Sequence, residues 1–128
     1  MTTRTPSLVL ASSSPARRRL LGVLTYRAEG PGLEVVTLNS LAGGRGIGTA
    51  LLAGVRRRAL VDGQRLWLTT GNDNVPAIGF YQRRGMEMVA LHRDFADEVR
   101  KVKPRLPGEP GGEITFRHAI ELEYPGHR

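Results

Sequence analysis

The chain has 128 residues, no cysteine and a formal net charge of +7. This length predicts one domain and excludes a two-domain enzyme, while the lack of cysteine excludes disulfides, thiolate metal sites and cysteine nucleophiles. A hydrophobic content of 40% is enough for one core, and no apolar run is long enough to cross a bilayer, so we expect a soluble, cytoplasmic protein without a membrane partner.

The positive charge comes from 17 arginines and two lysines against 12 acidic residues. Such an excess favours an anionic partner, which can be a nucleic acid, an acidic surface or a polyphosphate-bearing small molecule. Only three Phe, three Tyr and one Trp are present, and no helix-turn-helix pattern is visible. These features argue against nucleic acid as the partner.

The first 28 residues contain no Asp or Glu. Their pattern predicts a strand over Leu8–Ala11 and then a helix, with Ser14 as its cap and Pro15 in its first position, which ends near Gly22. A Ser-rich, Arg-rich and acid-poor transit peptide is an alternative reading of the same residues. We expect residues 1–21 to form a basic strand-helix segment in front of the main domain, residues 22–128.

Two extended runs follow, Val23–Arg27 and Leu33–Leu38, with Pro and Gly between them, which is typical of a β-hairpin. The glycine-rich stretch LAGGRGIGTALL at residues 41–52 then leads into an amphipathic helix, in which Ile47, Leu51, Val55 and Ala59 recur every four residues.

The rest of the chain alternates between strands and helices. We expect strands over Arg65–Thr70, Met86–His92 and Ile114–Glu123, a short helix in NVPAIGFYQRRG, and a helix from Asp94 to Pro104 with Phe95, Val99 and Val102 on one face. This order predicts an α/β (α+β) fold around one mixed sheet.

The glycine-rich loop joins a strand to a helix, which places free backbone N–H groups at a helix N-terminus. That arrangement binds phosphate, and Arg45 adds positive charge at the rim. A tight strand-to-helix turn with a glycine cap explains the same glycines without a ligand. The Walker A pattern fails because no lysine follows Gly48, and the dinucleotide fingerprint fails because Leu51 stands where glycine is needed.

The segment NDNVPAIGFYQRRGM follows one strand later. Together with the glycine-rich loop it resembles the GNAT family of acetyl-CoA-dependent N-acetyltransferases, over about Gly22 to Tyr124. The resemblance implies a mixed central sheet flanked by helices, with the family's amino-terminal strand-helix-helix-strand shortened or replaced. It also implies acetyl transfer from the co-substrate acetyl-CoA to an amine, by direct attack in a ternary complex and without a metal.

The resemblance assigns a pyrophosphate-binding loop to this chain. Gly46, Ile47 and Gly48 match the last three positions of the family's motif, whereas Gly43 stands where the family has Gln or Arg. The backbone donors implied for the coenzyme are those of Gly44, Arg45, Gly46, Ile47, Gly48 and Thr49.

In the second motif, Asn74, Ala77 and Tyr81 match the positions that line the coenzyme, and Arg83 is implied to reach its 3'-phosphate. Tyr81 would protonate the departing thiolate, although packing of its ring against the sheet is a structural alternative. The backbone of Leu38 and Asn39 would hold the thioester carbonyl, at a bulge where this strand splays from its neighbour.

Glu34 is the candidate general base. Strand alternation places Glu34, Val36 and Leu38 on one face, and family members carry a base on that face of this strand, although often at the position of Gly32. A substrate-orienting role and a solvated hairpin carboxylate remain open. The three histidines show no metal-ligand spacing, and we expect no metal site.

Residues 8–21 also resemble the opening motif of Maf-type nucleotide pyrophosphatases, with Ser12, Ser14 and Arg17 at its phosphate-contacting positions. The other motifs of that family are absent, which argues against pyrophosphatase activity.

The resemblance to acetyltransferases also implies that the helices normally preceding Gly22 are missing. We expect a second copy of the chain, as a homodimer, or another partner to cover the exposed sheet face. The acceptor, a small-molecule or peptide amine, cannot be read from the sequence. A non-catalytic acyl-CoA-binding or truncated GNAT-like module is the alternative function.

Overall fold

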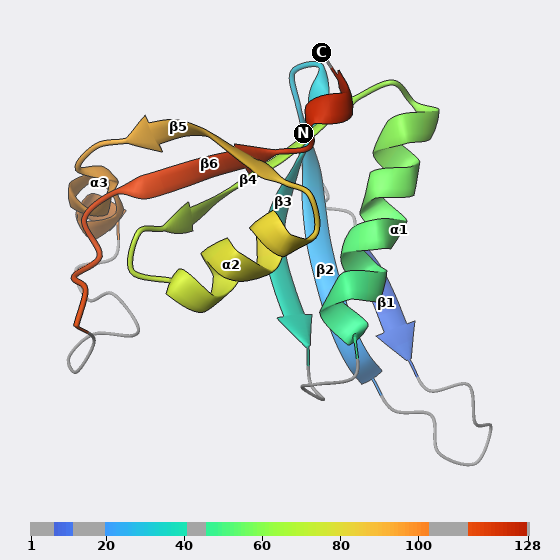
Figure 1. The fold of residues 1–128 in the computed structure, drawn as a ribbon, viewed down its shortest axis with the longest axis horizontal. Helices are drawn as coiled ribbons and strands as arrows, with labels where there is room; N and C mark the ends of the chain where they lie inside the picture. The colour runs from blue at the N-terminus through green and yellow to red at the C-terminus, as the bar shows by residue number, and fades with distance from the viewer. Residues whose placement is uncertain (1–6, 12–19, 41–45, 103–112, 128) are drawn as a thin grey trace. The chain divides into compact units, whose positions relative to one another are not determined.

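The computed structural model describes residues 7–11, 20–40, 46–102 and 113–127 (Figure 1). The chain divides into two compact units, the first ending at Trp67 and the second beginning at Leu68. The strands follow the hydrogen-bonding order β1-β2-β3-β4-β6-β5, in which β4 spans the boundary between the units.

The first unit contains β1 (Ser7–Ala11), β2 (Leu20–Glu29), β3 (Gly32–Ser40), α1 (Ile47–Val61) and the first residues of β4 (Arg65–Gly71). β1 pairs antiparallel with β2, and β2 with β3, whereas β3 and β4 are parallel. The hairpin predicted between β2 and β3 is confirmed, and Gly30 takes a φ of 57° in its turn, where a side chain would cause strain.

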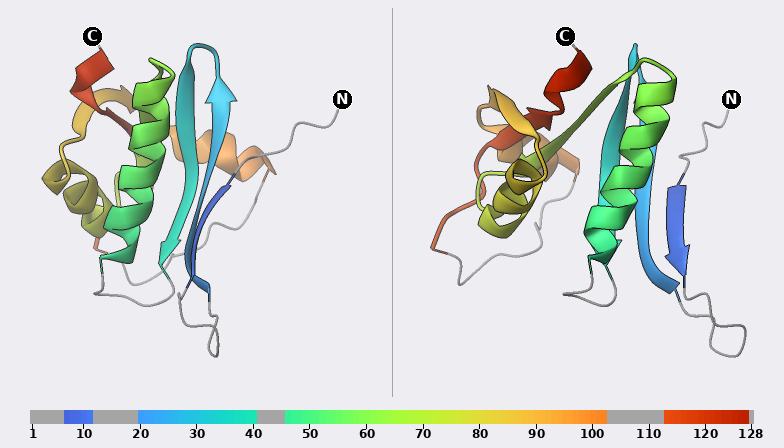
Figure 2. Two further views of the ribbon diagram at one scale, coloured as in Figure 1. Left: turned by 90° about the vertical axis from the view of Figure 1, so that its right-hand side faces the viewer. Right: turned by 45° about the vertical axis from the view of Figure 1, so that its right-hand side comes forward.

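Helix α1 lies against one face of this sheet (Figure 2). Its predicted apolar positions are all buried, with Leu52 as an additional member, and Leu24, Leu33 and Val35 of the strands are buried as well. At Gly22 the approach is close, because a Cβ there would lie 2.7 Å from Cγ2 of Ile47. This contact joins the first turn of α1 to β2.

The predicted amino-terminal helix cannot end near Gly22, because β2 already begins at Leu20 and Gly22 pairs with Leu10 and Ser40. Backbone pairing on both sides of Gly22 decides in favour of a strand. The predicted cap, Ser14, and Pro15 lie outside the described residues.

The second unit contains the end of β4, α2 (Val75–Arg83), β5 (Glu87–His92), α3 (Phe95–Val102), β6 (Ala119–Glu123) and the short 3-10 helix η1 (Pro125–His127). β5 and β6 are antiparallel. The core of the unit is formed by buried side chains of β4, α3 and β6 and of the residues just before β5 and just after β6: Leu68, Met86, Ala96, Ala119, Leu122 and Tyr124.

One expectation for the second unit was wrong in detail. The last strand begins at Ala119 rather than Ile114, because the backbone of residues 115–118 is bound by the side chain of Asn72 and by Ala96. In α3 the side chain of Val102 is 81% exposed, and Ala96 is the residue that is buried. No helix in the described part of the chain is long and apolar enough to span a membrane.

Candidate functional site

β3 contains the expected bulge. Thr25 pairs with Thr37 and the next residue, Tyr26, pairs with Val35, so Val36 is an extra residue on β3 and its side chain is 46% exposed. The parallel pairing with β4 extends only from Gly32 to Glu34, while β3 continues to Ser40. The backbone of Leu38 and Asn39 therefore lies beyond the parallel pairing with β4. On the opposite edge of β3, Leu38 and Asn39 pair with β2.

The bulge overturns one prediction about the faces of β3. Directly paired residues share a face, so Glu34 lies on the face of Arg27, and Leu38 lies on the face of Leu24. Arg27 and Leu24 are three positions apart in β2, which carries no extra residue, and so point to opposite faces. Glu34 and Leu38 therefore do not share a face, because the additional Val36 shifts the alternation by one position.

Glu34 forms an ion pair with Arg27. The Nε group of Arg27 donates to Oε1 of Glu34 at 2.7 Å, and the Glu34 side chain is only 12% exposed. This ion pair fixes the orientation of the Glu34 carboxylate on β3. Sequence reasoning missed Arg27, although the register of the hairpin, which places the two residues opposite each other, was the signal that could have identified it.

The described part of the glycine-rich loop begins at Gly46, whereas Gly43, Gly44 and Arg45 lie outside the described residues. Gly46 is the N-cap of α1 with φ 68° and ψ 17°, a left-handed conformation that favours glycine. The next two amides, of Ile47 and Gly48, have no acceptor in the preceding turn of the helix, and the first turn carries no acidic residue. This helix end is suited to an anion, while the buried Ile47 side chain anchors it to the core.

The second motif forms the first two turns of α2. Asn74 is the N-cap, and its Oδ1 accepts a hydrogen bond from the Ala77 amide at 3.4 Å. Tyr81 follows Ala77 by four residues, so Asn74, Ala77 and Tyr81 lie along one side of the helix. The structure thus places these three residues on one side of α2.

Tyr81 is half-buried, and its ring packs edge-on against Phe80 with the centroids 5.3 Å apart. Burial raises the pKa of the Tyr81 phenol above its ordinary value of 10.0, and the phenol of Tyr124 raises it further. The hydroxyl therefore keeps its proton at neutral pH and can act as a proton donor.

The two arginines at the end of α2 differ in their surroundings. Arg84 places its guanidinium carbon 3.8 Å from the ring centroid of Phe80 and donates to the Phe80 carbonyl, so it has a structural role. Arg83 is exposed, and its guanidinium lies beside Gly79, where Nη1 would be 2.9 Å from a Cβ. Of the two, Arg83 is the one that an external phosphate can reach.

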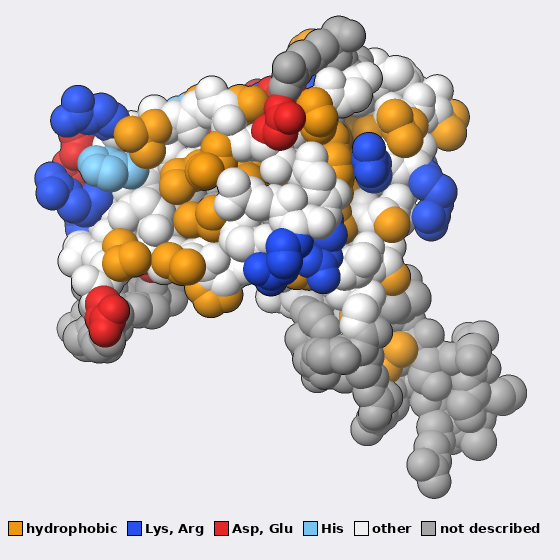
Figure 3. Space-filling model, viewed as in Figure 1, with side chains coloured by type: hydrophobic (Ala, Val, Ile, Leu, Met, Phe, Trp, Pro, Cys, Tyr) orange, Lys and Arg blue, Asp and Glu red, His pale blue; other side chains and the backbone are white. Residues whose placement is uncertain are grey.

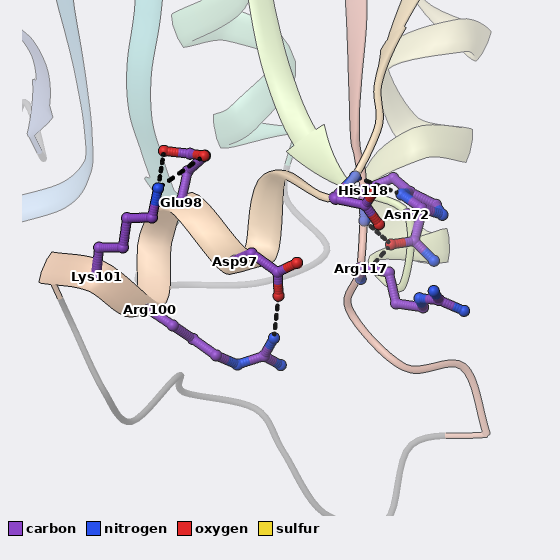
Figure 4. Close-up of polar contacts among 8 residues, drawn as sticks. Asn72, Asp97, Glu98, Arg100, Lys101, Arg117 and His118 are labelled. Atoms are coloured by element: carbon purple, nitrogen blue, oxygen red, sulfur yellow. Dashed lines mark hydrogen bonds and ion pairs between the residues drawn. The ribbon is translucent and has the colours of Figure 1, made fainter.

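Asn72, which the sequence analysis did not single out, organises the turn between β4 and α2 (Figure 4). Its Oδ1 accepts from the amides of Arg117 and His118, both at 2.9 Å, and its Nδ2 donates to the Thr115 carbonyl at 3.1 Å. The turn that leads into α2 begins at the last residue of β4, Gly71, whose carbonyl accepts a hydrogen bond from the Asn74 amide at 3.0 Å. Asn72 therefore fixes the strand end from which the Asn74–Tyr81 motif starts.

The histidines have structural contacts. His92 bonds to Glu121 at 2.9 Å, and Nδ1 of His118 accepts from the Asp94 amide at 2.9 Å. The side chain of His127 lies outside the described part. Among the side chains that the structure describes, no three His, Asp or Glu residues are grouped so that they could hold a metal ion.

The family model for the acetyltransferase (GNAT) family matches residues 9–86. Among curated proteins, the uncharacterized protein YdhI of Bacillus subtilis is 38% identical over 102 residues, which are 79% of this chain and 64% of YdhI. The chain thus spans slightly less than two thirds of this relative.

Solved structures show the same fold. An IAA acetyltransferase from Bacillus cereus superimposes with a TM-score of 0.69 at 24% identity, covering 83% of this chain and 70% of that one. A GNAT family acetyltransferase from Elizabethkingia anophelis, solved with acetyl-CoA bound, gives a TM-score of 0.70 at 21% identity, with coverages of 83% and 69%.

The matched region corrects the limits drawn from the sequence. It covers residues 9–86 rather than 22–124, so the last three residues of β1 and the segment after it fall within the family match. The Maf-type resemblance gains no support, and its residues Ser12, Ser14 and Arg17 lie outside the described part of the chain. The protein belongs to the GNAT family of acetyltransferases, to which both its sequence and its fold correspond.

Proposed function

We propose that this protein transfers the acetyl group of acetyl-CoA to a primary amine, carried by a small molecule or a peptide. The observation that carries the proposal is the Asn74, Ala77 and Tyr81 motif on one side of α2, with a Tyr81 phenol that stays protonated. The family to which the chain belongs supports acetyl-CoA as the co-substrate.

For coenzyme binding, we propose that the amides of Ile47 and Gly48, together with those of Gly44, Arg45, Gly46 and Thr49, bind the pyrophosphate. The left-handed Gly46 and the N-terminus of α1 support this role. Asn74 and Ala77 line the coenzyme in this proposal, and the exposed Arg83 binds the 3'-phosphate.

In the reaction, the nitrogen lone pair of the amine attacks the thioester carbonyl carbon, and the oxygen is stabilised by backbone at Leu38 and Asn39. The C–S bond then breaks, and Tyr81 donates its proton to the thiolate. The amine proton passes to Glu34, directly or through water, with Arg27 orienting the carboxylate. A new amide and free CoA are the products.

The test of the general-acid role is Tyr81→Phe, which removes only the hydroxyl. We expect CoA release to fall by about 100-fold or more, while calorimetry still detects acetyl-CoA binding. Tyr26→Phe, at a buried tyrosine of the first unit, is the matched control and should retain turnover. Unchanged turnover of Tyr81→Phe would refute the role of Tyr81, and no acetyl-CoA binding at sub-millimolar concentration would refute the function.

Glu34→Gln tests the proton acceptor. If Glu34 is the base, kcat falls and the acid limb of its pH profile disappears; if it only orients the acceptor, KM rises with little change in kcat.

A non-catalytic acyl-CoA-binding module is the second candidate, favoured because Gly43 stands where the family's pyrophosphate loop has Gln or Arg. Acetyl-CoA binding without CoA release, against a panel of amines, would support this alternative.

A further inference from the structure

β5 is the terminal strand in the hydrogen-bonding order of the strands that the structure describes. All six of its residues are exposed, and the exposed fractions of Met88 and Leu91 are 52% and 55%. Apolar side chains are visible on the surface of the second unit in Figure 3. An edge strand with exposed apolar side chains is a template for pairing with another strand.

A bulge in β5 places two of these apolar side chains on one face. Met88 pairs with Leu122 and Ala90 with Glu121, so Val89 is an extra residue. Met88 therefore shares the face of Leu122, and Leu91 shares the face of its own partner, Ile120. Ile120 and Leu122 alternate along β6 and lie on the same face. Met88 and Leu91 consequently share a face although they are three positions apart, which a regular strand would not allow.

The sequence of β5, EMVALH, is self-complementary when it is read antiparallel about a point between Val89 and Ala90. Met88 then stands opposite Leu91 of a second copy, and Glu87 opposite His92, which avoids like charges facing each other. Glu87 pairs with Glu123 and His92 with Ala119, so these two residues also share a face. Antiparallel pairing requires opposite residues to share a face, and the bulge meets this requirement for both pairs.

We propose that two copies of this chain associate through β5, antiparallel and with twofold symmetry, so that Met88 packs against Leu91 of the second copy. The interface is isologous because the same strand serves both copies. A pair of six-residue strands buries much less than the roughly 1,200 Å² of stable complexes. The dimer is therefore weak and its population depends on concentration.

Sedimentation equilibrium over a concentration series tests the association. The average mass should rise from 14.0 kDa towards twice that value. Met88→Lys or Leu91→Glu alone should weaken the dimer by about tenfold or more, because each places a charge opposite an apolar side chain. The double variant M88K/L91E should restore it, since each lysine then faces a glutamate. Val102→Lys, at a side chain that is 81% exposed on α3, is the control and should leave the mass unchanged.

A disulfide experiment tests the register, since the chain contains no cysteine of its own. Opposite residues in an antiparallel pair have Cβ atoms about 4.5–5.5 Å apart, close enough for a disulfide after small adjustments. In a mixture of Met88→Cys and Leu91→Cys, the disulfide between the two variants should form faster than the disulfide that either variant forms with itself. Val102→Cys, as the control, should not form a disulfide with either variant.

The proposal would be overturned by a 14.0 kDa monomer at all concentrations, by a dimer that the β5 changes do not affect, or by equal cross-linking of Val102→Cys. A monomer that instead binds an extended peptide of another protein along β5 would also overturn self-pairing. Because the measurements do not use acetyl-CoA, their result is independent of the proposed function.

Discussion

Tyr81 is the residue whose chemistry depends most directly on its burial. The phenol loses hydration on folding, and Tyr124 lies close enough to disfavour a second negative charge, so the pKa of Tyr81 exceeds 10.0. Deprotonation of Tyr81 is therefore harder in the folded protein than in the unfolded chain.

This difference predicts how stability changes at alkaline pH. Between the unfolded pKa of about 10 and the higher folded value, the folded state binds more protons than the unfolded state, so stability falls as pH rises through that range. We expect the free energy of unfolding to decrease above about pH 10, and to decrease less in Tyr81→Phe. Urea unfolding at a series of pH values measures both slopes. Parallel slopes for the two proteins would show that Tyr81 is not the titrating group.

Asn72 offers a second test at this scale. Asn72→Ala removes the acceptor of the Arg117 and His118 amides and should cost about 1–3 kcal/mol, because the part-buried amide of His118 loses its partner together with the exposed amide of Arg117. Asn72→Asp keeps the Oδ1 acceptor and loses only the bond to Thr115, so we expect a smaller loss. Urea denaturation compares the two. An equal loss in both variants would mean that the amide donor, rather than Oδ1, supplies the stability.

At the scale of elements, α1 is held by its apolar side. Leu52 is 1% exposed, whereas Leu60, on the same helix, is 63% exposed. Leu52→Ala should lower the free energy of unfolding by about 2–5 kcal/mol, and Leu60→Ala by less than about 0.5 kcal/mol. Because both changes are identical in chemistry and helix propensity, chemical denaturation isolates the effect of burial. Similar losses at both positions would contradict the packing of α1 described above.

The strands show where pattern reading reaches its limit. Alternation identified the strands, but it failed for Glu34 and Leu38 because a bulge at Val36 lies between them. A second bulge, at Val89 in β5, places Met88 and Leu91 on one face. A bulge depends on the pairing partner and leaves no periodic signal within the strand itself.

At the scale of the whole molecule, the net charge of +7 complements a coenzyme that carries several phosphate charges. A ligand that binds only the folded state stabilises it by about 2.7 kcal/mol at a concentration of 100 times Kd. Acetyl-CoA should therefore raise the unfolding midpoint. A higher salt concentration should reduce this shift, because it screens the charges.

Thermal unfolding with acetyl-CoA and with its analogue lacking the 3'-phosphate measures this effect and tests Arg83. The analogue should stabilise the wild type less, and Arg83→Ala should make the two ligands nearly equivalent. Arg57→Ala, at an exposed arginine of α1, is the control and should preserve the difference. Equal stabilisation of the wild type by both ligands would exclude a contact between Arg83 and the 3'-phosphate.

The sequence by itself determined the alternation of strands and helices, the apolar side of α1 and the two motifs, because these depend on residues close to one another in the chain. Gly46 and Asn74 are the N-caps of α1 and α2. A cap depends only on the residues of the first helical turn, so it can be recognised in the sequence. Tertiary structure alone decided that Asn72 binds residues 115–118, and that bulges change which side chains share a face in β3 and β5. Each of these features depends on which strand lies beside which, and that is settled by packing between segments distant in the chain.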